Sequence, residues 1–230
     1  IDDKMLNPVD DDASIATYYR LLAADMIPQC QKCIYLDADV IVLSDLTELY
    51  NIDLGDNYIA GVKDLPSIFT YEKMYWNFLP QKIDKISDLL DFSNYVNGGV
   101  LVMNLELIRK HKINEKFKFM VQHGIDDKSS YPYHDQDIIN IACNGHIKCI
   151  DLAYNFMPNF ISVVKEKLDQ AEYTAQQLEA IITSPVIIHY AMEKPWNQPF
   201  NDFFAIWWRY AHEAALQGKF IQISNKFNEI

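Results

Sequence analysis

The chain has 230 residues, of which 50% are hydrophobic and 13% aromatic, so it can bury the core of one α/β domain or of two small ones. Its net charge of −12 argues against non-specific nucleic-acid binding, which requires a basic surface, and does not favour an anionic membrane surface as a partner. The sequence has no apolar run long enough for a transmembrane segment, and it does not open with a basic region followed by an apolar one.

The four cysteines are interpreted as small apolar residues of a protein in a reducing cytoplasm. Cys30 and Cys33 have the CxxC spacing of half a zinc site, but Cys143 and Cys149 lack the spacing of a zinc knuckle. We therefore expect a cytoplasmic protein without structural zinc.

Strand and helix patterns alternate along the chain, which predicts an α/β fold with a largely parallel sheet and helices on both of its faces. In chain order we expect a helix at 12–27, a strand at 33–43, a short helix at 45–55 and a strand at 58–64. An irregular segment rich in aromatic residues follows at 65–94 and is predicted to pass over a site. We then expect a strand at 99–105, helices at 105–123 and 135–144, and short strands at 146–151 and 185–190. Aromatic residues recur at helical spacing in a last helix, at 200–218, and are predicted to pack on the core.

The stretch CIYLDADVIVL, at 33–43, places two acids in an otherwise apolar strand. A buried carboxylate is costly unless it is paired or bound to a metal. Asp37 and Asp39 are two residues apart, so both side chains point to one side of an extended chain. Because two carboxylates at a strand end suit a hard divalent cation, the pattern predicts a metal site, with a solvated turn as the alternative.

The blocks YVNGGVLVMNL and HDQDIINIACNG place polar residues beside a strand and a helix. After Asn97, the glycines Gly98 and Gly99 permit close approach of the backbone to a ligand, or a turn with positive φ. Taken alone, this block is better explained as a plain turn. In the second block, Asp135 or Gln136 could cap the helix, and helix N-termini in such folds also face ligands.

The block VIIHYAMEKPW, at 186–196, ends a strand with a histidine. A lone histidine after a strand is more often structural than a metal ligand. Together with the distant DxD, however, His189 could complete a metal site, and Lys194 could then meet a phosphate as a point charge.

In this order the blocks resemble the family 8 glycosyltransferases, which use nucleotide-diphospho-sugars and retain the anomeric configuration. The likeness extends from about Ser14 to Trp196 and is nearest to the bacterial enzymes that build lipopolysaccharide. It is carried by ATYYRLLAADMIP, YLDADVIVLSDLTELY, YVNGGVLVMNL, DQDIINIACNG, YNFMPN and HYAMEKPW. It implies a GT-A-type, Rossmann-like fold with a mixed, mainly parallel sheet, in a catalytic domain at 1–199 followed by a helical segment at 200–230.

The resemblance also implies a metal end and a sugar end of the site. Asp37, Asp39 and His189 would bind Mn²⁺, with Mg²⁺ as the alternative, and Asp39 would also approach the ribose. Lys194 would hold the diphosphate. The sugar end would consist of Arg20, Asn97, Gly98, Asp135 and Gln136, with Asp64 on the acceptor side.

The implied reaction moves glucose or galactose from a UDP-sugar to a saccharide or glycolipid acceptor, in lipopolysaccharide or other surface-glycan synthesis. Because the neutral amide of Gln136 is a poor nucleophile, we expect same-face attack, with Gln136 and Asp135 lining an oxocarbenium-like sugar. The expected location is the cytoplasm, with peripheral attachment to the inner face of the membrane as the alternative. The sequence carries no signal for an oligomeric state.

Two departures from the family pattern bear on these expectations. The loop Ala191-Met192-Glu193 has no glycine where the family usually has one, and Glu193 would repel a diphosphate unless it points away. The family's uracil- and ribose-binding strand, turn and helix have no counterpart here, so we expect this first nucleotide-binding strand to be missing and activity to be impaired. A non-catalytic UDP-sugar-binding relative is therefore a second hypothesis. A third is a haloacid-dehalogenase-type phosphatase, whose hhhDxDxT motif YLDADVIVL also resembles.

Overall fold

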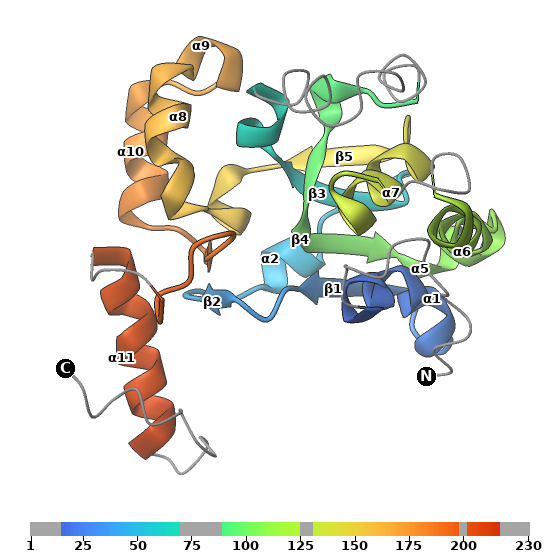
Figure 1. Cartoon of the computed structure of the whole chain (residues 1–230), viewed down its shortest axis with the longest axis horizontal. Helices are drawn as coiled ribbons and strands as arrows, with labels where there is room; N and C mark the ends of the chain where they lie inside the picture. Colours follow the sequence, from blue (N-terminus) through green and yellow to red (C-terminus); the bar gives the residue numbers. More distant parts are fainter. Residues whose placement is uncertain (1–14, 70–88, 125–130, 198–201, 217–230) are drawn as a thin grey trace.

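The computed structural model describes residues 15–69, 89–124, 131–197 and 202–216 (Figure 1). The beginning of the helix expected at 12–27 and most of the aromatic segment expected at 65–94 lie outside these ranges, although residues 65–69 are helical. Within the described ranges, no helix combines the length and the apolarity that a membrane crossing requires.

The main sheet has four strands in the order β1-β4-β3-β5. β1 (Lys32–Leu36), β3 (Ile59–Lys63) and β5 (Ile147–Ile150) share one direction, while β4 (Val96–Asn104) lies between β1 and β3 and runs antiparallel to both. The sheet is therefore mixed, with three of its four strands in one direction, as expected. The sequence pattern could not show that β4 is the strand that runs the other way, because a buried central strand is a continuous apolar run whichever way it runs.

The strand expected at 33–43 is interrupted at its two acids. β1 ends at Leu36, and β2 (Val40–Val42) pairs antiparallel with β6 (Ile187–His189) in a separate two-stranded sheet, with Val40 opposite His189. The segment 37–39 therefore lies between two ladders, where a carboxylate does not have to be buried inside a sheet. The same pairing brings the end of β6 beside the two aspartates.

One group of helices lies at one end of the main sheet (Figure 1). It comprises η2 (Ile15–Leu22), α1 (Ala23–Met26), α5 (Leu105–Lys110), α6 (Ile113–His123) and α7 (His134–Ala142). The expected helix at 12–27 is a 3-10 helix up to Leu22 and α-helical only after it. The expected helix at 105–123 is divided, because Lys112 adopts a left-handed conformation with φ 58° between α5 and α6.

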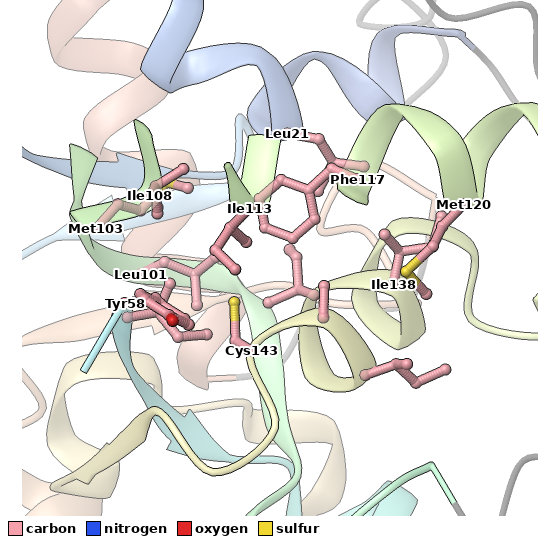
Figure 2. Close-up of a cluster of buried hydrophobic side chains, with 14 of the residues drawn as sticks. Leu21, Tyr58, Leu101, Met103, Ile108, Ile113, Phe117, Met120, Ile138 and Cys143 are labelled. Atoms are coloured by element: carbon pink, nitrogen blue, oxygen red, sulfur yellow. The ribbon is translucent and has the colours of Figure 1, made fainter. Parts of the chain in front are cut away.

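These helices form a hydrophobic core with β4 (Figure 2). Phe117 of α6 is fully buried there against the strand side chains Leu101 and Met103. Val100 and Val102 point to the opposite face, because side chains alternate along a strand, and they join a smaller cluster with α2 (Thr47–Tyr50). β4 is therefore buried on both faces, and packing on each side holds it in place relative to the helices.

A second core lies under helices that the sequence pattern did not predict. After η3 (Phe92–Asn94), η4 (Leu152–Asn155) and η5 (Pro158–Phe160), the chain forms α8 (Ile161–Glu166), α9 (Leu168–Ala171) and α10 (Ala175–Thr183). A capping box between Thr174 and Gln177 begins α10 and is the sequence signal that could have revealed it. The C-terminal helix α11 (Asp202–Leu216) adds Phe204 and partly buried Trp207 and Trp208 to this core, which confirms the expected packing.

Candidate active site

Asp37, Asp39 and His189 form a cluster whose ligand atoms all lie within 4.8 Å of one another. Nε2 of His189 is 3.8 Å from Oδ2 of Asp37 and 3.4 Å from Oδ1 of Asp39. The aspartates are half-buried between β1 and β2, and His189 is buried at the end of β6. Two carboxylates and an imidazole that converge on one point are a fitting donor set for a divalent cation.

Gly99 of β4 allows this cluster to form. A Cβ atom at position 99 would lie 2.2 Å from Cε1 of His189 and 2.9 Å from Oδ2 of Asp37, which is closer than non-bonded atoms approach. Gly98 and Gly99 both lie inside β4, and neither has a positive φ. The turn considered from the sequence is therefore wrong, and close approach is the reason for the glycine at position 99.

Two basic side chains neutralise the aspartates. Nη2 of Arg20 lies 2.8 Å from Oδ1 of Asp37, and the hydroxyl of Tyr35 donates to the same oxygen at 2.7 Å. Nζ of Lys194 donates to Oδ2 of Asp39 and, at 2.8 Å, to the carbonyl of Tyr190. Burial acts to raise the pKa of Asp39, but the neighbouring His189 and Lys194 outweigh it and hold this pKa well below its usual range.

The predicted sugar-end residues Asp64, Asn97 and Gln136 form a hydrogen-bond network, in which Asp64 and Asn97 are buried and Gln136 is half-buried. Oε1 of Gln136 accepts from the backbone of Gly98 at 2.9 Å and from Nδ2 of Asn97 at 3.1 Å. Nε2 of Gln136 donates to Oδ2 of Asp64 at 3.0 Å and to the Tyr95 hydroxyl at 3.1 Å. A side-chain amide has two acceptor and two donor positions, so the amide of Gln136 is fully engaged within the protein.

Asp135 is bound to the rest of the site through Arg20. Nε of Arg20 lies 2.8 Å from Oδ2 of Asp135, while Nη1 donates to the carbonyl of Gly98 at 2.7 Å. Within the described residues, this Oδ2 atom receives no well-oriented hydrogen bond. Arg20 therefore connects the metal end, at Asp37, with an acceptor atom at the sugar end.

Substitution of Asp135 by asparagine should change the pH dependence of stability. Burial raises the pKa of Asp135 to about 7; Arg20 opposes this rise and Asp37 adds to it. Between about pH 4 and pH 7 the folded protein holds a proton that the unfolded chain has lost, so its stability falls as the pH rises, by up to about 1.4 kcal/mol per pH unit. In Asp135→Asn this slope should disappear, and the variant should be the more stable protein at pH 8. Urea unfolding of both proteins at pH 4.5, 6 and 8 measures how stability depends on pH. An equally steep fall in both proteins would show that the proton bound in the folded state is not on Asp135.

The loop after β6 contains a strained residue. Met192 has a φ of 68° and an 80% exposed side chain, in the segment where the sequence lacks the glycine usual in the family. A residue with a Cβ atom in the left-handed region costs roughly 1 kcal/mol relative to glycine. We expect Met192→Gly to raise the free energy of unfolding by up to about 1 kcal/mol, whereas Met192→Ala, which keeps the Cβ atom, should not. Urea unfolding of the two variants tests this, and equal stabilities would contradict it.

The structure adds three polar residues that the sequence reasoning missed. Asp137 is fully buried and accepts from the Tyr95 hydroxyl at 2.7 Å and from the backbone of Tyr133 at 2.8 Å. Asn140 bonds the backbone of Val96 on β4. Asn155 donates to Oδ1 of Asn97 and contacts Nδ1 of His189. The motifs DQDIINIACNG and YNFMPN contain all three of these residues, which is the signal that could have found them.

The expected cap of the helix at 135–144 is wrong. α7 begins at His134, and its N-cap is Tyr133, whose side chain makes no capping hydrogen bond; the backbone N–H of Tyr133 donates to Asp137 instead. Asp135 and Gln136 thus lie in the first turn, with φ 46° at His134 immediately before them. Their side chains are turned to Arg20 and to β4 instead of to the helix backbone.

The family model described as "Glycosyl transferase family 8" matches residues 3–199. Lipopolysaccharide 1,2-glucosyltransferase of Escherichia coli is 29% identical over 190 residues, which cover 81% of this chain and 51% of the relative. General stress protein A of Bacillus subtilis is 27% identical over 199 residues, covering 81% of this chain and 62% of the relative. The chain thus spans a little over half the length of these relatives.

Solved structures are similar over most of the chain. Galactosyltransferase LgtC in complex with donor and acceptor sugar analogs has a TM-score of 0.59 and 26% identity, covering 94% of this chain and 71% of LgtC. The bifunctional glycosyltransferase WbbM has a TM-score of 0.67 at 23% identity, covering 86% of this chain and 35% of WbbM, and shows likeness of fold. These folds confirm the GT-A class, and the family match is incompatible with the haloacid-dehalogenase hypothesis. Because that match covers most of its residues, the chain belongs to glycosyl transferase family 8.

Proposed function

We propose that the protein is a metal-dependent, retaining hexosyltransferase that moves glucose or galactose from a UDP-sugar to a saccharide or glycolipid acceptor. The observation that carries the proposal is the convergence of Asp37, Asp39 and His189 within 4.8 Å. A relative named as a lipopolysaccharide glucosyltransferase and a fold neighbour named as a galactosyltransferase support a hexose donor and a surface glycan as product. UDP as the carrier and a cytoplasmic location rest on the family resemblance.

At the metal end, the donor set favours Mn²⁺ over Mg²⁺, because imidazole is a softer ligand than Mg²⁺ prefers. A bound cation would supply Lewis-acid stabilisation of the departing diphosphate. Lys194 pairs with Asp39, and its ammonium group would turn to a phosphate oxygen once a bound cation neutralises that carboxylate. Arg20 would stay between Asp37 and Asp135 and keep the two ends of the site in register.

At the sugar end, Asp135 and Gln136 would play different parts. Oδ2 of Asp135 is buried beside Arg20 and receives no well-oriented hydrogen bond from the described residues, whereas the Gln136 amide is saturated by protein contacts. We therefore assign Asp135 to contact with the transferred sugar and Gln136 to holding Gly98 and Asp64 in place. As the bond from C1 to the diphosphate breaks, the Asp135 carboxylate would stabilise the positive charge on the sugar ring.

The acceptor would then attack on the face that the diphosphate leaves, which retains the configuration at C1. The acceptor hydroxyl forms the new C1–O bond, and its proton passes to the departing phosphate oxygen. Asp64, buried beside Asn97 and Gln136, lies on the side where the family resemblance places the acceptor. A glycosyl adduct trapped on Asp135 would contradict this mechanism in favour of a covalent intermediate.

A screen of UDP-hexoses with Mn²⁺, read by mass spectrometry, tests the proposed function. We expect slow hydrolysis of UDP-glucose or UDP-galactose in the absence of acceptor and a hexose adduct in its presence. A GDP-hexose serves as the matched control and should be left intact. UDP-sugar binding without turnover would favour the second candidate, a non-catalytic binding protein, for which the glycine-free loop at Met192 and Glu193 is the specific feature. Absence of UDP-sugar binding would contradict both.

A further inference from the structure

A chain of buried hydrogen bonds leads from the backbone of β4 to the imidazole of His189. The N–H of Gly99 donates to Oδ1 of Asn97 at 2.9 Å. Nδ2 of Asn155 donates to the same Oδ1 atom at 2.9 Å, and Oδ1 of Asn155 lies 2.9 Å from Nδ1 of His189. Asn155 is fully buried, and His189 is 4% exposed.

In this series of hydrogen bonds, the donor and the acceptor of each bond are fixed by groups that can play only one of the two roles. A backbone N–H is a donor only, so the atom of Asn97 that faces Gly99 must be its oxygen. The NH₂ group of Asn97 then faces acceptors, Oδ2 of Asp64 and Oε1 of Gln136, each at 3.1 Å. The oxygen of Asn97 in turn requires the NH₂ group of Asn155. If Asn155 were reversed, two amide oxygens would meet at hydrogen-bond distance in a buried place, which costs several kcal/mol.

The orientation of Asn155 decides which nitrogen of His189 carries a proton. The oxygen of Asn155 can only accept, so Nδ1 of His189 must be the donor. In the neutral imidazole, Nε2 then carries the lone pair. This lone pair is the group that lies 3.4 Å from Asp39 and 3.8 Å from Asp37, which are themselves acceptors. A divalent cation bound by these three groups would offset the repulsion between such acceptors.

We infer that Asn155 is a positioning residue: its side-chain oxygen holds His189 in the Nδ1–H tautomer, so that the Nε2 lone pair is presented to a divalent cation shared with Asp37 and Asp39. The inference rests on the metal site of the proposed function and adds to it a residue that does not touch the metal. A partner that orients the second nitrogen of a ligating histidine fixes the ring and raises its basicity, and loss of such a partner typically costs 10–100-fold in metal affinity.

The first experiment measures the tautomer in the unaltered, metal-free protein. Long-range ¹H–¹⁵N correlation spectra at pH 8.5, above the ordinary range in which a histidine titrates, distinguish the protonated nitrogen of His189 from the bare one. We expect Nδ1 to be protonated and Nε2 to be bare. A protonated Nε2, or a mixture of the two tautomers, would overturn the inference and would leave the metal site itself untouched.

The second experiment compares Asn155→Asp with Asn155→Leu. The aspartate keeps an acceptor toward Nδ1 of His189 but sets its second oxygen against Oδ1 of Asn97, so a loss of stability is expected and is measured separately by urea unfolding. In the folded variant the tautomer should be retained, and Mn²⁺ should bind within about 3-fold of the original affinity or more tightly. The leucine removes the acceptor, so the tautomers should mix and the Mn²⁺ affinity should fall 10–100-fold. Isothermal titration of each folded variant with Mn²⁺ alone gives the affinities, and the same correlation spectra give the tautomers.

Asn140→Leu is the matched control, because Asn140 is also a buried asparagine but bonds the backbone of Val96 and Gln136. It should lower the unfolding temperature while the tautomer of His189 and the Mn²⁺ affinity stay the same. A purely structural role of Asn155 predicts a different order, with the buried charge of Asn155→Asp as damaging to Mn²⁺ binding as the leucine, and that result would overturn the inference. Failure of the unaltered protein to bind Mn²⁺ would instead contradict the proposed function.

Discussion

Substitution of Asp37 or Asp39 by alanine is expected to lower the affinity for Mn²⁺ by more than about 100-fold, since even residues that only support a metal ligand contribute 10–100-fold. Each change removes one of the three converging donors. It also removes a carboxylate partner from a cation close to the metal position: Arg20, which keeps Asp135, beside position 37, or Lys194 beside position 39. Titration with Mn²⁺, followed by calorimetry and by the spectroscopic signal of free Mn²⁺, measures the loss.

The fold should survive both changes, because the two side chains are half-buried and lie between ladders instead of inside a core. The chain carries a net charge of −12, so unspecific attraction of Mn²⁺ has to be separated from binding in the site. Glu48→Gln is the control, since Glu48 is exposed and its loss changes the net charge by the same amount. Unchanged Mn²⁺ affinity in both aspartate variants, with circular dichroism showing intact folds, would refute the metal site.

Substitution of Gly99 by alanine is expected to disrupt the same metal site by a clash between β4 and the His189 side chain. The added methyl group would overlap the His189 ring, with 2.2 Å to Cε1 and 2.8 Å to Nδ1, and would press on Asp37 at 2.9 Å. β4 is buried on both faces and cannot yield easily, so the ring must move away from the aspartates. We expect the free energy of unfolding to fall by about 1–3 kcal/mol and Mn²⁺ binding to be lost.

A double-mutant cycle tests the stated cause. If the clash is with the His189 ring, Gly99→Ala should cost much less stability in a His189→Ala background, because the shortened side chain leaves room for the methyl group. Gly98→Ala is the neighbouring comparison, and its Cβ atom would lie 3.2 Å from the flexible end of Arg20, so its cost should be smaller. A cost for Gly99→Ala that is the same with and without the His189 side chain would show that the clash lies elsewhere.

Local sequence patterns predicted the strand segments well and their partners poorly. The apolar runs at 58–64 and 99–105 correspond to β3 and to most of β4, because burial leaves its mark on each residue. The direction of β4 and the change of sheet at Asp37 depend on which distant segments pair, and a run of Val, Ile and Leu does not encode that. The helices at 161–183 were missed because, apart from the capping box at Thr174, their signals are weak.

For the candidate site, the motifs named the residues and their proximity follows from the fold. Asp37, Asp39, His189 and Lys194 were all singled out from two blocks more than 140 positions apart, about 33–43 and 186–196, and the structure brings them together. The pairing of β2 with β6 places His189 opposite Val40, which directly follows Asp39 in the sequence. Their roles in catalysis stay predictions until the experiments above are done.

The sequence by itself determined that this is a globular, acidic α/β protein with the motifs of family 8. Residue types and their spacing suffice for that, since each motif is local. Only the tertiary structure decided that Gly99 is present to admit an imidazole, that Arg20 spans two carboxylates, and that Asn155 faces the far nitrogen of His189. These features are distances and hydrogen-bond directions between segments far apart in the chain, and such quantities exist only once packing of the core has fixed the strands relative to one another.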